Sequence, residues 1–171
     1  FNKCSSLTKI SIPSSIKYIG SNSFNECTSL ERVFIPPNVE LIDTCAFNGC
    51  SSLVAVRLPR GLKHIGESAF NDCFSLKTIH VAIGCNLEKI EYGCFNGCMN
   101  LETLELPNSL TEICDNAFCG CESLVSVTIP NKVHSIGEKA FMNCKSEMVK
   151  ELLKRGAIIT KEMIEKQINN K

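Results

Sequence analysis

The sequence predicts a repeat solenoid, a fold in which short units of one chain stack along a single axis. Phenylalanine recurs every 23 residues, with one interval of 25, and a cysteine follows each of these phenylalanines by three residues. Each unit also contains the pattern L-x-x-[IVL]-x-[IVL]. A unit of this length cannot bury its own apolar face, so it must stack on copies of itself. The cysteines that mark the units are Cys4, Cys27, Cys50, Cys73, Cys98, Cys121 and Cys144.

Within each unit, the segment L-x-x-I-x-I predicts a short strand. Apolar and polar residues alternate there at period two, which is typical of a strand buried on one face only. Proline lacks a backbone donor and ends five of the six strands, so the chain turns there. Glycine marks a second corner, and we expect a short helical turn where an Ala or Ser precedes the repeated Phe. The corner residues are Pro13, Pro36, Pro59, Pro107 and Pro130, then Gly20, Gly66 and Gly137.

The full unit, C-x-x-L-x-x-I-x-I-P-x-x-I-x-x-I-G-x-x-A-F-x-x-C, resembles the BspA-like leucine-rich repeat family. The resemblance implies a curved leucine-rich repeat solenoid with its parallel β-sheet on the concave face and short helical turns and loops elsewhere. It also implies a binding scaffold of the kind found in surface adhesins of bacteria and in families of protozoan parasites, with no catalytic residues. Residues 1–144 form the predicted array, with six full repeats after a partial first one.

The array departs from this pattern at a few positions. Ala82 replaces the proline of its unit, and the segment AIGCN adds two residues. Asp43, Glu91 and Cys114 replace the corner glycine. We expect local bulges or looser corners at these places.

The twelve cysteines would suggest disulfides or a metal site if the repeat were overlooked. Seven of them occupy one repeat position, where a small apolar thiol suits a buried column, so we expect reduced thiols and no metal or other cofactor. The other five fall at different repeat positions, and a thiol-based redox or metal-binding protein is the alternative function. These five are Cys45, Cys85, Cys94, Cys114 and Cys119.

Enzymatic activity and binding to nucleic acid or membrane are not expected. His64, His80 and His134 lie at three different repeat positions, and no nucleophile lies in a recognisable motif. The 18 basic and 18 acidic residues balance, so no overall field attracts a polyanion. There is no run of 18 apolar residues and no visible signal peptide, which leaves a cytoplasmic or a cell-surface location open. Because the chain begins inside a repeat, we expect it to be a piece of a longer array.

Residues 145–171 abandon the repeat and predict a C-terminal cap of two short amphipathic helices. Ser146 and Thr160 are suitable N-cap residues, and Gly156 follows the first predicted helix. The segment VKELLKRGA also resembles the second helix of an ankyrin repeat, so the start of an ankyrin-like segment is the alternative.

The function that we expect from the sequence is a protein-interaction or adhesion scaffold, whose partner the sequence does not identify. In L-x-x-I-x-I the polar positions point outward from the sheet, and most of them carry small or polar residues. Phe34 is the exception, and we expect it one rung from Arg57 and beside Arg32. Its ring could pack on the arginine stems, or it could bind a partner, since aromatic and arginine side chains are enriched at interface hot spots. The candidate partner-binding residues are Arg32, Phe34, Arg57, His80 and Glu105.

Overall fold

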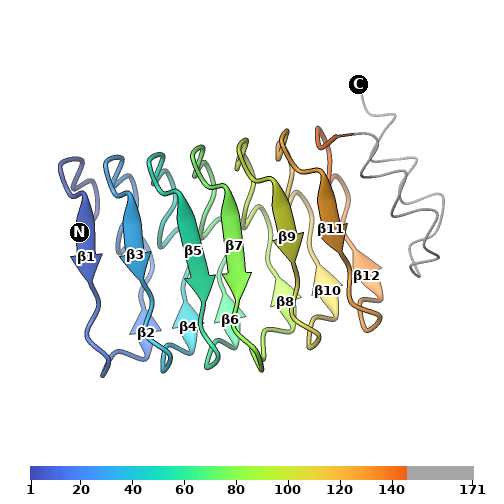
Figure 1. Ribbon diagram of the computed structural model, residues 1–171, viewed down its shortest axis with the longest axis horizontal. Coiled ribbons are helices and arrows are strands. Elements are labelled where there is room, and N and C mark those ends of the chain that lie inside the picture. Colours follow the sequence, from blue (N-terminus) through green and yellow to red (C-terminus); the bar gives the residue numbers. More distant parts are fainter. Residues whose placement is uncertain (146–171) are drawn as a thin grey trace.

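The computed structural model describes residues 1–145, which form a solenoid of stacked coils with two rows of strands (Figure 1). The first row is one parallel sheet of six strands in chain order. Its strands are β1 (Lys9–Ser11), β3 (Arg32–Phe34), β5 (Ala55–Leu58), β7 (Thr78–Val81), β9 (Thr103–Glu105) and β11 (Ser126–Thr128). The predicted repeat solenoid with a parallel β-sheet is thus confirmed.

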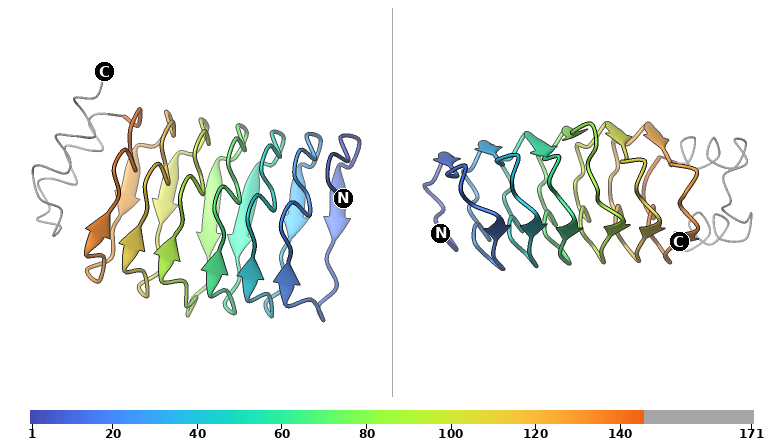
Figure 2. Two further views of the ribbon diagram at one scale, coloured as in Figure 1. Left: turned by 180° about the vertical axis from the view of Figure 1, so that it is seen from behind. Right: turned by 90° about the horizontal axis from the view of Figure 1, so that it is seen from below.

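The second row lies on the other side of the solenoid and was not predicted (Figure 2). It consists of two-residue strands at the corner after the proline, arranged as two parallel sheets of three strands. The strands of one sheet are β2 (Tyr18–Ile19), β4 (Leu41–Ile42) and β6 (His64–Ile65). Those of the other are β8 (Lys89–Ile90), β10 (Glu112–Ile113) and β12 (Ser135–Ile136). Strands this short are below the length at which alternation can be recognised in a sequence.

The inserted residues explain why the second row is divided in two. Strands β7 and β9 pair with Thr78 opposite Thr103, an offset two residues longer than in the other pairs of this sheet. The extra residues lie between β7 and β8, next to the place where β6 and β8 fail to join one sheet. They form an exposed turn in which Ile83 is 97% exposed. The looser corner expected near Ala82 is therefore present.

The core is built around a column of phenylalanine rings. Neighbouring rings stack with centroids 5.0 to 5.5 Å apart and planes within 9° of parallel. Aromatic pairs favour offset stacking at this separation. The rings of Phe47, Phe70, Phe95 and Phe118 are essentially inaccessible to solvent. Each ring is covered by its neighbours above and below, so no coil can complete the core alone.

The repeated cysteine couples each coil to the one before it. Its thiol donates a hydrogen bond of 3.0 to 3.4 Å to the backbone carbonyl of the phenylalanine 26 residues earlier, or 28 residues earlier across the insertion. The thiols of Cys27, Cys50, Cys73, Cys98 and Cys121 are buried, as predicted, and all twelve cysteines are free. A cysteine thus supplies a small apolar group that also satisfies a buried acceptor.

The segment around each phenylalanine is a series of tight turns, and the expected short helical turn is wrong for residues 1–145, where no helix is found. Alternate backbone amides donate hydrogen bonds to the next coil, as Phe24 does to the carbonyl of Ala46 at 2.7 Å. These amides therefore cannot form the hydrogen bonds of a helix. The residue before each repeated cysteine also has a positive φ, for example 55° at Glu26 and 74° at Gly97. A left-handed residue interrupts a right-handed helix.

A ladder of asparagine side chains runs beside the phenylalanines and was also not predicted. Each amide nitrogen donates to the side-chain oxygen of the asparagine in the coil before it, at 2.7 to 3.0 Å. The ladder residues are Asn2, Asn25, Asn48 and Asn71. Asn96 stands at this repeat position in the next coil, and it is followed by Cys119 and Met142, which lack a side-chain amide. The predicted helical cap at 145–171, with Ser146 and Thr160, lies outside the described residues apart from its first residue.

Replacing a buried ring should destabilise the chain far more than replacing an exposed one. Phe70 is fully buried in the column, whereas Phe34 is 63% exposed on the six-stranded sheet. We expect Phe70→Ala to lower the free energy of unfolding by about 3 to 5 kcal/mol and Phe34→Ala to change it by about 0.5 kcal/mol or less. Urea unfolding of both variants measures the difference. Similar losses in the two variants would contradict the role given to the column.

The buried thiols should make the chain less stable at alkaline pH. Burial raises the pKa of Cys50 to about 12, whereas an unfolded cysteine ionises near pH 8.5, so above that pH only the unfolded state loses the proton. The stability from this thiol is complete below about pH 8.5 and is lost as the pH rises toward its folded pKa. Between pH 9 and 11, we expect the free energy of unfolding of Cys50→Ala to fall less steeply with pH than that of the parent. The two slopes should differ by up to about 1.4 kcal/mol per pH unit. Equal slopes for variant and parent would contradict the assignment.

Candidate binding surface

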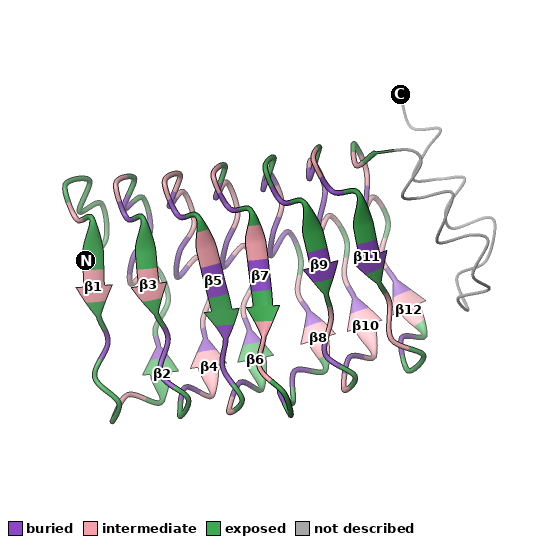
Figure 3. Ribbon diagram, in the orientation of Figure 1, coloured by how far each residue is buried: buried purple, intermediate pink, exposed green. Residues whose placement is uncertain are grey.

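The outward side of the six-stranded sheet, here called the sheet face, is a regular platform of side chains. Parallel pairing places residues of equal repeat position side by side, as in Lys9 beside Arg32 and Arg57 beside His80. The alternation of exposed and buried residues along these strands puts two columns of side chains on the outside (Figure 3). Every strand of this sheet is fixed by its neighbours, so the platform is rigid and only its side chains vary.

All five residues predicted for partner binding lie on the sheet face. Arg32 and Phe34 stand at the two ends of β3 and both are exposed. Arg57 lies on β5 opposite His80 on β7, and Glu105 lies on β9 opposite Thr128. The ring of Phe34 remains 63% exposed, so its neighbours cover it only in part.

A hollow opens over β3 and β5, where these two strands of the sheet pair incompletely. Strands β3 and β5 pair only through Arg32 and Ala55, whereas β5 and β7 pair over four positions. The hollow has a volume of about 420 Å³. The small side chain of Ala55 leaves space among larger neighbours. The residues that line it are Glu31, Arg32, Val33, Val54, Ala55, Val56, Arg57 and His80.

A second hollow lies further along the sheet face. Its volume is about 380 Å³, and His80, Glu105 and Thr128 are among its lining residues. His80 therefore borders both hollows and links the two halves of the predicted site. Val54 and Ala55 were not predicted to belong to this site, and the only signal for the first hollow is that Ala55 is the smallest residue of its column.

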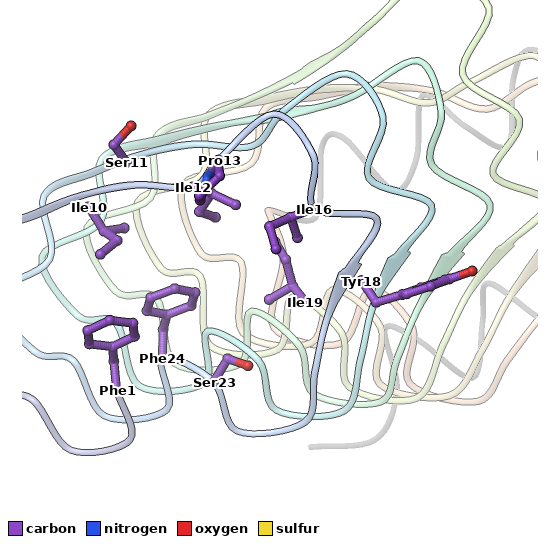
Figure 4. Close-up of a pocket in the computed structure, with 10 residues that line it drawn as sticks. All are labelled: Phe1, Ile10, Ser11, Ile12, Pro13, Ile16, Tyr18, Ile19, Ser23 and Phe24. Carbon is purple, nitrogen blue, oxygen red and sulfur yellow. The ribbon is translucent and has the colours of Figure 1, made fainter.

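The hollow at the N-terminal end of the array has a different character. Figure 4 shows Phe1, Phe24 and Ile16 directed into it, while Ser11 and Tyr18 point away. Its apolar residues occupy positions that in later coils are covered by the coil before. We therefore regard this hollow as the stacking surface of the first coil and not as a ligand site.

Charges on the two rows of strands are arranged in opposite ways. In the second row they are paired between coils: Glu40 bonds to Lys63 at 2.7 Å and lies 3.7 Å from Lys17. The hydrogen bond from Lys63 lowers the pKa of Glu40. Lys89 likewise pairs with Glu91 and Glu112. On the sheet face, within residues 1–145, the side chains of Arg32, Arg57, Lys77, Glu102 and Glu105 have no ion pair or hydrogen bond.

Comparison with known families agrees with this geometry. A family model described as the BspA type leucine rich repeat region, in six copies, matches residues 1–99 and 88–161. The chain belongs to this family. A search of curated proteins gives no significant match.

Solved structures of bacterial leucine-rich repeat proteins resemble this BspA-type chain. A leucine rich cell surface protein of Faecalibacterium prausnitzii is 31% identical over 81% of this chain and 46% of its own, with a TM-score of 0.64. A leucine-rich repeat protein of Bacteroides ovatus is 30% identical over 84% of this chain and 43% of its own, also with a TM-score of 0.64. That of T. pallidum is 29% identical over 87% and 83%, with a TM-score of 0.65. The chain thus spans less than half the length of the first two.

Four of the five cysteines outside the BspA-type column are poorly suited to thiol chemistry. The thiol of Cys114 lies 3.6 Å from a carboxylate oxygen of Glu112 and 3.8 Å from one of Glu91. Burial raises its pKa to about 12 despite the nearby Lys89. Burial also raises the pKa values of Cys85, Cys94 and Cys119. The thiolate is the reactive and metal-binding form, so these environments disfavour both roles.

The described residues were also searched for a metal site and for a membrane-spanning helix, neither of which the sequence predicts. Among residues 1–145, no group of three or more His, Cys, Asp or Glu side chains is arranged to hold a metal ion. The same part of the chain contains no helix with the length and apolar character that a membrane span requires. His64 lies on β6 in the second row and His80 on β7 in the first, so the histidines do not converge on one site.

Proposed function

We propose that this chain is a non-catalytic protein-binding scaffold that uses the sheet face to hold its partner. The observation that carries the proposal is an exposed aromatic ring, Phe34, on the same strand as Arg32, which together with Arg57 lines a hollow of the sheet face. A ring that is 63% exposed contributes little to folding, yet it provides a large apolar contact for another protein.

The geometry favours binding because little order has to be created on association. Arg32 and Arg57 both project from paired strands, so their backbone positions are fixed before a partner arrives. Preorganisation reduces the entropic cost of forming an interface. The hollow between them could accept one side chain of the partner, and buried anchors of this kind dominate the energy of protein interfaces. His80 and Glu105 extend the site along the array.

Adhesion at a cell surface is the more specific form of this proposal. It is supported by the relative from Faecalibacterium prausnitzii, which is a leucine rich cell surface protein. It is also supported by the pneumococcal vaccine antigen PcpA, which is 30% identical over 75% of this chain and 30% of its own. The thiol-based alternative receives no support from the cysteine environments, because burial keeps these thiols protonated.

Removing the exposed aromatic and its arginine neighbour should abolish most of the binding without unfolding the chain. The test uses Phe34→Ala with Arg57→Ala, and the matched control is Tyr18→Ala with Lys17→Ala on the second row, because Tyr18 is also 63% exposed. Immobilised parent and variants are incubated with extract of the source cells, and recovered proteins are quantified by mass spectrometry. The dissociation constant of the main recovered protein is then measured by calorimetry.

We expect the sheet-face variant to lose about 2 kcal/mol or more of binding free energy, as hot-spot truncations do. The control should bind within about 0.5 kcal/mol of the parent. Loss of binding in the control with full binding by the sheet-face variant would place the site on the second row and overturn the proposal.

A further inference from the structure

We propose that the partner binds the sheet face with a polypeptide segment that lies across the strands from β3 toward β9. Along this segment, an apolar anchor residue comes first, an acidic part follows, and a basic residue comes last. This inference rests on the proposed function and specifies the chemistry of the partner. It comes from the uneven distribution of charge along the sheet face, which overall composition conceals because the whole chain is neutral.

Positive charge is concentrated over the first four strands of the sheet. Lys9, Arg32, Arg57 and Lys77 are exposed there, with Glu31 as the acidic residue among them. Lys9 lies directly opposite Arg32 in the pairing of β1 and β3. Among residues 1–145 none of these basic side chains has an ion pair. Like charges on neighbouring rungs repel one another, and carboxylates from a partner would relieve this repulsion.

Negative charge follows on the next strand. Glu102, just before β9, and Glu105, at its end, are exposed and are likewise unpaired within the described residues. The neighbouring rung over β11 carries only Ser126 and Thr128 in the two columns. The sheet face therefore has a positive part and a negative part, and a partner that satisfies both must carry the two opposite charges in a fixed order.

The second row of strands offers no comparable opportunity. Its lysines are already paired with glutamates, as Lys17 and Lys63 are with Glu40. A charged partner would have to break these pairs. The charged side chains of the sheet face are unpaired, so a charged partner can bind there without breaking an ion pair.

A polypeptide fits this surface better than a nucleic acid. A phosphate backbone is uniformly negative and would be repelled by Glu102, just before β9, and by Glu105, at the end of that strand, which is two rungs from β5. The hollow lined by Arg32 and Arg57 is also lined by Val54 and Ala55, and Val54 is 43% exposed. Apolar surface next to two arginines matches an aliphatic or aromatic side chain flanked by carboxylates, since a carboxylate accepts two parallel hydrogen bonds from a guanidinium.

The rung spacing sets the order of residues in the partner. Strands in a sheet are about 4.8 Å apart and an extended chain advances about 3.3 Å per residue. From Arg57 on β5 to Glu105 on β9 is two rungs, or about 10 Å, which about three extended residues span. We therefore expect the order apolar anchor, acidic residue, basic residue in the segment, with the basic residue about three positions from the acidic one.

A library of random twelve-residue peptides displayed on phage tests this inference on the full 171-residue chain. We expect the selected peptides to combine an apolar residue, one or more acidic residues and a basic residue about three positions further on. Synthetic copies should bind Phe34→Ala with Arg57→Ala about tenfold or more weakly. They should bind Tyr18→Ala with Lys17→Ala like the parent, and binding should weaken as salt rises from 50 to 500 mM.

The outcomes separate this inference from the function on which it rests. Peptides that need Phe34 and Arg57 but are neutral or basic would overturn the inference and leave the sheet face as the binding surface. Peptides that bind the sheet-face variant as well as the parent would overturn both. A selection that enriches no sequence would also count against the inference, because an unpaired bipolar face should retain complementary segments.

Discussion

The whole structure depends on the contact between one coil and the next. A coil of 23 residues has no interior of its own, and its Phe ring, its cysteine thiol and its strand are all completed by the adjacent coil. The ring of Phe47 stacks on that of Phe70, while the thiol of Cys73 bonds to the carbonyl of Phe47. Both contacts act along the same axis, so they fix the register of each coil relative to its neighbours.

The insertion near Ala82 shows which part of this coupling is essential. Across the insertion, the rings of Phe70 and Phe95 remain stacked with centroids 5.3 Å apart. The six-stranded sheet also continues there, with paired residues two positions further apart in the sequence than elsewhere. The second row divides there instead. The two-residue strands of that row contribute few hydrogen bonds, so their loss costs less than a break in the column would.

The column and the main sheet could be predicted because their signals repeat in the sequence. Phe, Cys and the L-x-x-I-x-I pattern recur at one spacing, and a recurring buried position must stack. The second row could not be predicted from strands such as Tyr18–Ile19, since two residues show no alternation. The helical turn was predicted wrongly because residues such as Glu26 and Cys45 adopt positive φ under constraint from the next coil, and neither residue type signals this.

The candidate site was predictable only in part, for a related reason. Alternation placed Arg32, Phe34 and Arg57 on the outside correctly, because outward positions follow from the strand period. The hollow beside them depends on how far β3 and β5 pair and on the size of Ala55, neither of which a repeat pattern specifies. Repetition thus determines the interior, while the differences between repeats determine the surface.

Stability and binding are accordingly carried by different residues of the same coils. Interior positions are nearly identical from coil to coil, whereas the outward columns change from Lys9 to Arg32 to Ala55 within two rungs. This separation lets the sheet face carry unpaired charge and an exposed ring without weakening the column. On the second row, for which we propose no binding, lysine and glutamate side chains form ion pairs.

The most direct test of this separation is a protease-resistance scan of single alanine substitutions across residues 1–145. We predict that losses of resistance recur every 23 residues, or 25 across the insertion, at the phenylalanine, cysteine and strand-core positions. Substitutions of Arg32, Phe34, Arg57, His80 and Glu105 should leave resistance near that of the parent. Losses spread evenly over both groups, without the repeat period, would contradict the account.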